Sequence, residues 1–231
     1  MSRTDRAAQL VLDLGHRPAL AREDFLVAPC NEEAVAWLDR WPDWPSSAVI
    51  LVGAAGAGKS HLARVWRART SAASVEAASL RRSDPWAWLK PAPVCVVEDA
   101  PGGVDEQALL HLLNAATEAE GHLLITAVSP PSRWALRLPD LASRMRAAPI
   151  AELRAPDDAL LGAVMVKLFA DRQVTVTPEV VSYVLPRMER SFAALRALVV
   201  ALDEAALAQA RAVTVPLARE VLLDLSNEPV S

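Results

Sequence analysis

Hydrophobic and polar positions along the first two thirds of the chain predict strands and helices in alternation. Wholly apolar, β-branched runs such as Ala48–Val52 are typical of strands buried on both faces of a parallel sheet. The predicted strands are 48–52, 74–78, 94–97, 122–128 and 149–153. The predicted helices are 31–41 (with Asn31 as N-cap), 59–69, 105–120 and 132–147. This order favours right-handed βαβ units and a mostly parallel sheet covered by helices, an α/β fold.

The strand pattern stops near residue 155, and helical periodicity continues alone. Leu195, Leu198 and Leu202 repeat at the spacing of one helix face. The predicted helices here are 157–172, one that begins at Thr177-Pro178-Glu179, 191–211 and 215–225. We therefore predict three segments: a tail at 1–22, an α/β domain at 23–154 and a small helical domain at 155–231.

Composition excludes several classes of protein. The chain has 231 residues, 52% hydrophobic and 23% charged, so it is not a disordered chain. Its apolar runs are too short for a spanning helix, and its first residues do not form a signal peptide. Cys30 and Cys95 are too few for a disulfide framework and lack zinc-site spacing, which fits a reducing cytoplasm. The net charge of −4 gives no overall field that would attract nucleic acid.

The segment between the first predicted strand and its helix carries the clearest chemistry. Residues 53–60, GAAGAGKS, match the pattern G-x-x-x-x-G-K-[ST]. Gly53, Gly56 and Gly58 allow backbone N–H groups to turn around phosphate oxygens, and Lys59 neutralises the β- and γ-phosphates. The Ser60 hydroxyl is a ligand for Mg²⁺. The segment predicts a nucleotide-binding site.

A pair of carboxylates ends the strand at 94–97. Glu98 takes the expected metal position, and Asp99 takes the position that orients water for hydrolysis. The usual order places aspartate in the metal position. Here the longer Glu98 takes that position, and the shorter Asp99 holds the water-orienting carboxylate about one methylene from its usual place. We therefore expect slow hydrolysis by the protein alone.

These motifs together resemble an AAA+ module, in particular that of the bacterial replication initiator DnaA, over about residues 23–225. The matching segments are Gly58-Lys59-Ser60-His61-Leu62, Phe25-Leu26-Val27, Ile125 to Pro131, Leu141-Ala142-Ser143-Arg144-Met145, Glu189-Arg190 and Val213 to Pro216. The resemblance implies a five-stranded AAA+ sheet followed by an all-α lid. It implies that Phe25 and His61 contribute to an adenine-nucleotide site holding ADP or ATP.

The same resemblance assigns roles to two arginines. It implies that Arg144 is a finger that reaches a neighbouring subunit's ATP, with Arg146 as its rival. It implies that Arg190 contacts the chain's own nucleotide. The family pattern places a polar sensing residue near Val128, where this chain has an apolar side chain and only Thr126 and Ser129 nearby.

The N-terminal tail narrows the resemblance further. DnaA continues into a helix-turn-helix domain, for which we expect no room before Ser231. A short relative with a glutamine-leucine tail resembles the Hda family of regulatory inactivators of DnaA. The tail residues that match its clamp-binding peptide are Gln9, Leu10, Leu12 and Leu14. In an extended peptide the three leucines form one apolar row.

This resemblance implies a cytoplasmic regulator that binds the DNA sliding clamp (the polymerase β subunit) and promotes hydrolysis of DnaA-bound ATP. Sequence-specific DNA binding and membrane contact are not expected, and a homodimer is compatible with it. A helicase-loader-like ATPase acting on single-stranded DNA is the alternative, but it needs a basic, aromatic-lined groove. A small-molecule P-loop kinase is a third hypothesis. It is disfavoured because such a kinase needs a single compact α/β domain, whereas this chain has a second, helical domain.

Overall fold

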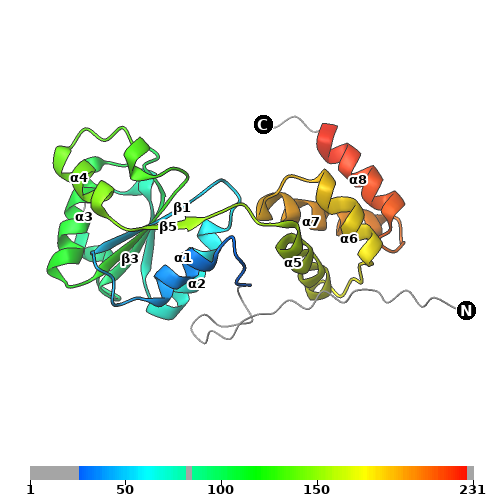
Figure 1. Ribbon diagram of the computed structural model, residues 1–231, viewed down its shortest axis with the longest axis horizontal. Helices are drawn as coiled ribbons and strands as arrows, with labels where there is room; N and C mark the ends of the chain where they lie inside the picture. Colours follow the sequence, from blue (N-terminus) through cyan, green and yellow to red (C-terminus); the bar gives the residue numbers. More distant parts are fainter. Residues whose placement is uncertain (1–25, 82–84, 228–231) are drawn as a thin grey trace, which may run out of the picture.

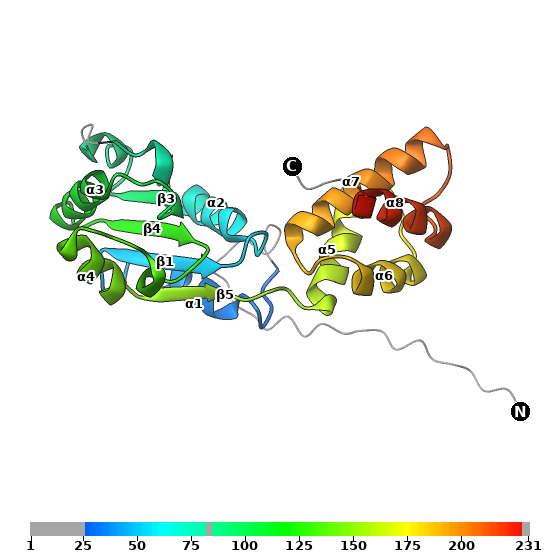
Figure 2. The same ribbon diagram turned by 90° about the horizontal axis from the view of Figure 1, so that it is seen from above.

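A computed structural model describes residues 26–81 and 85–227, which form an α/β unit followed by a helical unit (Figures 1 and 2). Strand β5 ends at Leu153, and the first helix of the second unit begins at Asp158. Only four residues therefore join the two units on this path. Within the described residues, no helix is long and apolar enough to cross a membrane.

Five parallel strands form the sheet, in the order β2-β3-β4-β1-β5. Their bounds are β1 Ala48–Gly53, β2 Ala73–Glu76, β3 Val94–Ala100, β4 His122–Ala127 and β5 Ile150–Leu153. Ile50 of β1 pairs with Ile125 of β4 on one side and with Ile150 of β5 on the other. The predicted α/β fold with a parallel five-stranded sheet is confirmed.

Strand β1 shows why its residues are uniformly apolar. Successive side chains of a strand point to opposite faces of the sheet. Ile50 belongs to the core on one face, and Val49 and Leu51 belong to the core on the other. Both faces are covered by helices, so every position of the strand is buried. Cys95 of β3 is buried in the same way, and burial raises the pKa of its thiol to about 12.

Two helices cover each face of the sheet. Helices α1 (Glu32–Asp39) and α2 (Lys59–Thr70) supply Leu38, Leu62 and Trp66 to one face. Helices α3 (Glu106–Glu118) and α4 (Pro139–Ala147) cover the other face with their apolar residues. Figure 1 shows the strands between α3 and α4 on one side and α1 and α2 on the other, which is the arrangement expected for βαβ units.

The predicted helix at 132–147 is shorter in the structure. A 3-10 turn, η3 (Pro131–Arg133), is followed by extended residues, and α4 begins only at Pro139. Proline disfavours helical backbone in the residue before it, and Leu138 is extended. The Glu106 carboxylate also accepts the backbone N–H groups of Arg137 and Leu138, which holds this segment against the start of α3.

The helical unit has a core of its own. Its elements are α5 Asp158–Asp171, α6 Pro178–Val184, a 3-10 turn η4 Leu185–Arg187, α7 Phe192–Ala208 and α8 Val215–Asn227. The predicted face of α7 is buried at Leu195, Leu198 and Leu202. Asp158 pairs with Arg190 where α5 and α7 begin, and Arg172 pairs with Asp203 near their other ends. The two helices therefore run in the same direction, with both N-termini toward the α/β unit.

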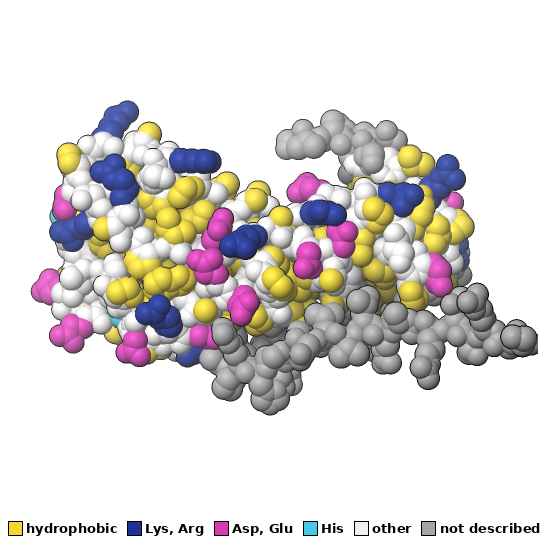
Figure 3. Space-filling view, in the orientation of Figure 1, with side chains coloured by type: hydrophobic (Ala, Val, Ile, Leu, Met, Phe, Trp, Pro, Cys, Tyr) yellow, Lys and Arg dark blue, Asp and Glu magenta, His cyan; other side chains and the backbone are white. Residues whose placement is uncertain are grey.

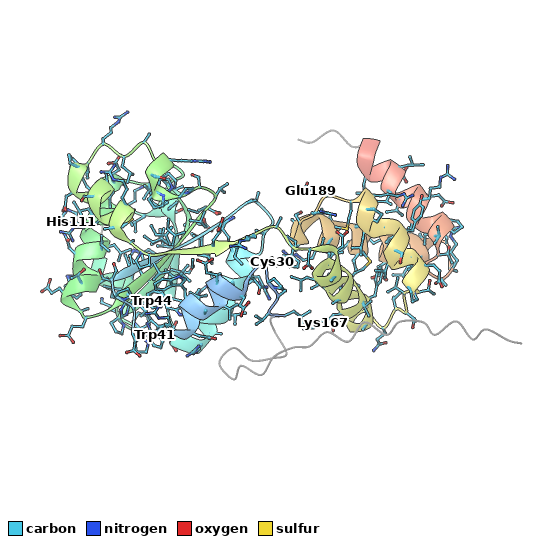
Figure 4. The ribbon with its side chains drawn as sticks, viewed as in Figure 1. Cys30, Trp41, Trp44, His111, Lys167 and Glu189 are labelled. Carbon is cyan, nitrogen blue, oxygen red and sulfur yellow. The ribbon has the colours of Figure 1, made fainter. Side chains whose placement is uncertain are left out.

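A tryptophan cluster packs one edge of the α/β core. The Trp44 ring stacks on Trp66 with centroids 5.4 Å apart, and Trp41 meets Trp66 edge-on. Figure 4 shows Trp41 and Trp44 close together beside α1. His122, the first residue of β4, packs edge-on against Trp44 at 5.3 Å. Burial in this position lowers the pKa of His122.

We expect His122 to make the folded state less stable in acid. Its lowered pKa means that the unfolded chain takes up the proton first as the pH falls. The stability contribution is therefore complete above the ordinary histidine pKa of about 6.5 and is lost as pH drops below it. Urea unfolding at pH 7.5 and pH 5.5 should show a larger loss for wild type than for His122→Gln. Exposed His111 supplies the matched control, His111→Gln, and equal losses in all three proteins would contradict the prediction.

Candidate functional site

The loop between β1 and α2 is shaped by glycines in left-handed backbone. Strand β1 ends at Gly53, and α2 begins at Lys59. Gly56 has φ +73° and Gly58 has φ +102°, values that residues with a Cβ rarely adopt. The predicted P-loop residues thus lie together at the carboxyl end of β1, where the N-terminus of α2 favours a bound anion.

Lys59 is folded into this loop. It is only 7% exposed, and its Nζ donates hydrogen bonds to the carbonyl oxygens of Gly53 and Ala54, each at 2.9 Å. Burial lowers the pKa of Lys59, and the nearby Asp99 carboxylate acts in the opposite direction. The loop therefore holds a desolvated ammonium, which interacts strongly with an incoming phosphate.

The helical unit docks directly on the loop. The Phe192 backbone N–H, at the start of α7, donates to the Gly56 carbonyl at 3.0 Å. A Cβ on Gly56 would lie 2.8 Å from the Ser191 Cβ, and one on Gly58 would lie 3.4 Å from the Phe192 ring. Sequence reasoning missed this contact because its residues are more than 130 positions apart. The only local signal was Ser191, whose side chain caps α7 by accepting from the Ala194 N–H.

A cleft of about 250 Å³ lies between the two units, beside the loop. Its walls are mainly apolar, as suits a planar base and a sugar. Figure 4 shows Lys167 projecting from α5 on the helical unit's side. The residues that line the cleft are Leu26, Asn31, Gly58 and His61 from the α/β unit and Leu160, Val164, Lys167, Leu168, Asp171, Phe192 and Arg196 from the helical unit. His61, predicted at the nucleotide site, therefore lies on the cleft.

Asn31 shapes one wall of the cleft instead of capping α1. It precedes α1 as predicted, but its side chain makes no cap hydrogen bond with that helix. Its Oδ1 accepts from the Ala28 N–H at 2.8 Å, and its Nδ2 donates to the Leu26 carbonyl at 2.9 Å. Asn31 is 2% exposed, so both bonds are shielded from water. It fixes the segment 26–28 beside the cleft.

The two predicted carboxylates lie at the carboxyl end of β3. Glu98 Oε1 accepts a hydrogen bond from the Ser74 hydroxyl at 2.8 Å. Asp99 is exposed and has φ +58°, a left-handed conformation that aspartate tolerates better than most residues with a Cβ. Glu76 pairs with Glu98 in the register of β2 and β3. Burial raises the pKa of Glu76, and the Glu98 and Asp99 carboxylates raise it further.

These oxygen donors suit Mg²⁺. Ser60 is exposed in the first turn of α2, and Glu98 and Asp99 are carboxylates at the neighbouring strand end. Mg²⁺ typically takes one or two protein carboxylates together with phosphate oxygens and water. Among residues 26–81 and 85–227, no three His, Cys, Asp or Glu side chains are arranged to hold a metal by themselves. The donor set therefore fits an ion that binds together with a nucleotide.

Arg144 lies far from this cleft. It is on α4, which packs against α3 and η3, and no residue of α4 lines the cleft. Figures 1 and 2 both place α4 at the end of the α/β unit remote from the helical unit. Its Nε donates to Asp140 and its Nη1 to Asn114, each at 2.9 Å, while the side chain stays exposed. A guanidinium has five N–H donors, so the held group still has donors for another molecule.

Arg190 lies beside the P-loop contact. It directly precedes Ser191 and Phe192, which touch the loop, and its Nη2 donates to Asp158 Oδ2 at 3.1 Å. This surface ion pair is weak, because both side chains are largely exposed. The Arg190 guanidinium also keeps N–H donors that this ion pair does not use.

The polar group near the end of β4 is buried. Val128 is 59% exposed, whereas Thr126 is wholly buried and its hydroxyl accepts the Asp99 N–H at 3.0 Å. Of the other predicted residues, Phe25 and the tail residues Gln9, Leu10, Leu12 and Leu14 lie outside the described part of the chain. The predictions for them remain sequence-based.

Comparison with known proteins agrees with this geometry. The family described as "Hda, lid domain" matches residues 163–222. Domain III of the Thermotoga maritima replication initiation protein DnaA is similar with a TM-score of 0.74 and 17% identity, covering 92% of this chain and 99% of that one. AMPPCP-bound DnaA from Aquifex aeolicus has a TM-score of 0.66 and 13% identity, covering 81% of this chain and 66% of that one.

A second group of AAA+ proteins has the same fold. The Thermotoga maritima RuvB Holliday junction branch migration motor has a TM-score of 0.69 and 16% identity, covering 90% of this chain and 71% of that one. Identities this low show a shared fold and no more, whereas the lid-domain match is a likeness in sequence over residues 163–222. The lid-domain match over residues 163–222 and the fold shared with DnaA domain III together support an AAA+ protein related to Hda and DnaA.

Proposed function

We propose that this protein is an adenine-nucleotide-binding AAA+ regulator of replication initiation in the cytoplasm. In this proposal it binds the sliding clamp through its tail and promotes hydrolysis of ATP held by the DnaA initiator. The observation that carries the proposal is the separation of Arg144 from the chain's own cleft. An arginine that cannot serve its own nucleotide is suited to serve the nucleotide of a partner.

The nucleotide part of the proposal is supported by the loop and the cleft. The glycine-rich loop with Lys59 suits a polyphosphate, and the apolar walls beside it suit a base. Arg190 directly precedes Ser191 and Phe192, which contact the loop, and we expect it to reach a phosphate bound there. Mg²⁺ bound with the nucleotide would be held by Ser60 and Glu98, and it would supply charge neutralisation at the phosphates. Either ADP or ATP fits this arrangement.

Turnover by the protein alone is expected to be slow. Asp99, in the position to orient water, is a short side chain on left-handed backbone. Val128, at the expected sensing position, cannot form a hydrogen bond through its side chain. Arg144, which would stabilise transition-state charge, lies at the far end of the unit. The machinery therefore suits nucleotide binding by this chain and hydrolysis on a partner.

The overall test is ATP hydrolysis by the initiator in the presence of DNA-loaded clamp. Adding the wild-type protein is expected to stimulate hydrolysis, because Arg144 completes the partner's site in trans. No stimulation at any concentration would remove the regulator function. Calorimetry with ADP and ATP tests the nucleotide site separately.

The clamp-binding tail makes its own prediction. The double variant Gln9→Ala with Leu12→Ala is expected to abolish clamp binding, because each leucine buried in a groove contributes ~1.5–3 kcal/mol before ordering costs. Nucleotide binding should survive, since the change lies outside the loop and the cleft. Surface plasmon resonance against immobilised clamp measures the first effect, and calorimetry measures the second. Unchanged clamp affinity would contradict the assignment of the tail.

One feature favours a second candidate function, the binding of single-stranded DNA. Arg133, Arg137, Arg144 and Arg146 are all exposed within one short stretch, and only Arg144 has a carboxylate partner among the described residues. Figure 3 shows Lys and Arg side chains over this end of the α/β unit. Such a patch attracts phosphate backbones. Retention of labelled single-stranded DNA in filter binding, with no effect on the initiator, would favour this candidate.

A further inference from the structure

A threonine hydroxyl joins two strands at the point where their ladder is interrupted. Strands β3 and β4 pair regularly up to Val97 and Ile125, and the register then shifts before Ala100 pairs with Ala127. Within the shift, Thr126 Oγ1 accepts the Asp99 N–H at 3.0 Å. The side chain thus supplies the acceptor that the backbone does not provide at this bulge.

This bond helps to select the backbone conformation of Asp99. Asp99 has φ +58°, a left-handed conformation that aspartate adopts more readily than most residues with a Cβ and that the hydrogen bond fixes here. Its carboxylate acts on Lys59 across the loop, where it favours the charged ammonium. Without this acceptor, we expect the Asp99 backbone to be less fixed and its carboxylate to be less firmly placed near Lys59.

Burial makes the hydroxyl of Thr126 a dependable anchor. Thr126 is 0% exposed, so water does not compete for its lone pairs. Glu98, the neighbour of Asp99, is held in turn by the Ser74 hydroxyl at 2.8 Å. One hydroxyl from β4 and one from β2 therefore fix the two consecutive acids from opposite sides of β3.

We propose that Thr126 is a positioning residue for the nucleotide site. It fixes the backbone of Asp99 beside Glu98, so that the Asp99 carboxylate adds negative charge next to the ion site and a nucleotide is held more tightly when it carries a divalent cation. This inference rests on the proposed nucleotide function. It assigns the Mg²⁺ dependence of nucleotide binding to a side chain inside the sheet. Thr126 acts through Asp99 and touches neither nucleotide nor ion.

The test compares nucleotide affinity with Mg²⁺ and with EDTA in wild type and in Thr126→Val, which keeps the shape and removes the hydroxyl. Calorimetry gives the ratio of ATP affinity in Mg²⁺ to ATP affinity in EDTA, which we call the Mg²⁺ gain. This ratio is expected to be about tenfold smaller in Thr126→Val than in wild type. Affinity in EDTA should change by less than about twofold, because the loop itself is untouched. Thr126→Ser, which restores a hydroxyl, should recover most of the gain.

Thr70 provides a matched control for the loss of a buried hydroxyl. Its Oγ1 donates to the Trp66 carbonyl within α2, away from the site, and it is 7% exposed. Thr70→Val is expected to reduce stability as Thr126→Val does and to leave the Mg²⁺ gain intact. If Mg²⁺ increases ATP affinity equally little in both variants, the effect is merely structural and the inference is overturned. The inference is also overturned if Mg²⁺ increases ATP affinity in Thr126→Val as much as in wild type.

Hydrogen exchange on the wild-type protein gives a reading that needs no variant. The Asp99 amide is expected to exchange slowly although its residue is exposed, because the Thr126 hydroxyl protects it. Fast exchange of this amide in the folded protein would overturn the inference. If wild type binds no nucleotide in either buffer, the proposed function itself fails. If wild type binds nucleotide more tightly with Mg²⁺ and Thr126→Val shows the same increase in affinity, only this inference fails.

Discussion

Replacing Lys59 with alanine is expected to weaken nucleotide binding by about 100-fold while the protein remains folded. Charged hydrogen bonds to phosphate contribute ~1.5–3 kcal/mol each, and ~1.4 kcal/mol corresponds to a factor of ten. The ammonium is held inside the loop by the carbonyls of Gly53 and Ala54. Calorimetry with ADP and ATP measures the loss.

The chain offers a matched control for this experiment. Only three of its 24 basic residues are lysines, and Lys90 is exposed on the segment that precedes β3. Lys90→Ala removes the same charge from the protein without touching the loop, and its affinity should stay near that of wild type. An affinity of Lys59→Ala close to the Lys90→Ala value would contradict the phosphate-binding role. Circular dichroism confirms that both variants are folded.

Replacing Arg144 with alanine is expected to reduce stimulation of initiator ATP hydrolysis by at least about 100-fold. An arginine inserted into a partner's site stabilises charge on the transferring phosphoryl group. Asp140 and Asn114 hold the Arg144 guanidinium at the surface, so little ordering entropy opposes its insertion. The measurement is phosphate release from initiator-bound ATP with DNA-loaded clamp.

Arg146 distinguishes this role from a general charge effect. It is exposed on the same helix, two residues further on, and the same substitution removes the same charge. Arg146→Ala is expected to retain most of the stimulation, and both variants should bind ADP and clamp as wild type does. A loss confined to Arg146→Ala would move the finger to that residue. Equal stimulation by wild type and Arg144→Ala would remove the finger role.

Much of this protein could be predicted from short-range patterns. The run Ala48–Val52 is apolar at every position because both faces of its strand are covered, and that alone indicates a parallel α/β sheet. The spacing from Gly53 to Ser60 indicates a phosphate loop because backbone turn and helix start lie within eight residues. The spacing of Leu195, Leu198 and Leu202 likewise indicates one buried helix face.

Other features had no short-range signal. The helix expected at 132–147 is interrupted before Pro139, and the Glu106 carboxylate from α3 holds the extended segment. Asn31 has the sequence position of a helix cap, yet its side chain binds residues 26–28. In the first case a carboxylate from another helix holds the segment, and in the second the backbone groups of Ala28 and Leu26, close in sequence, compete with the helix cap.

The order of residues along the chain was enough to establish the α/β-then-helical arrangement, the P-loop and the acidic strand end, because each depends on spacing within a few residues. Packing between distant segments placed α7 on Gly56, Arg144 away from its own cleft and the Thr126 hydroxyl under Asp99. Those contacts join residues from 27 to more than 130 positions apart, and their geometry depends on how whole strands and helices pack. Local composition does not specify that packing, and so only the fold sets the helical unit against the glycine-rich loop, Arg144 away from the cleft and the Asp99 N–H on the Thr126 hydroxyl.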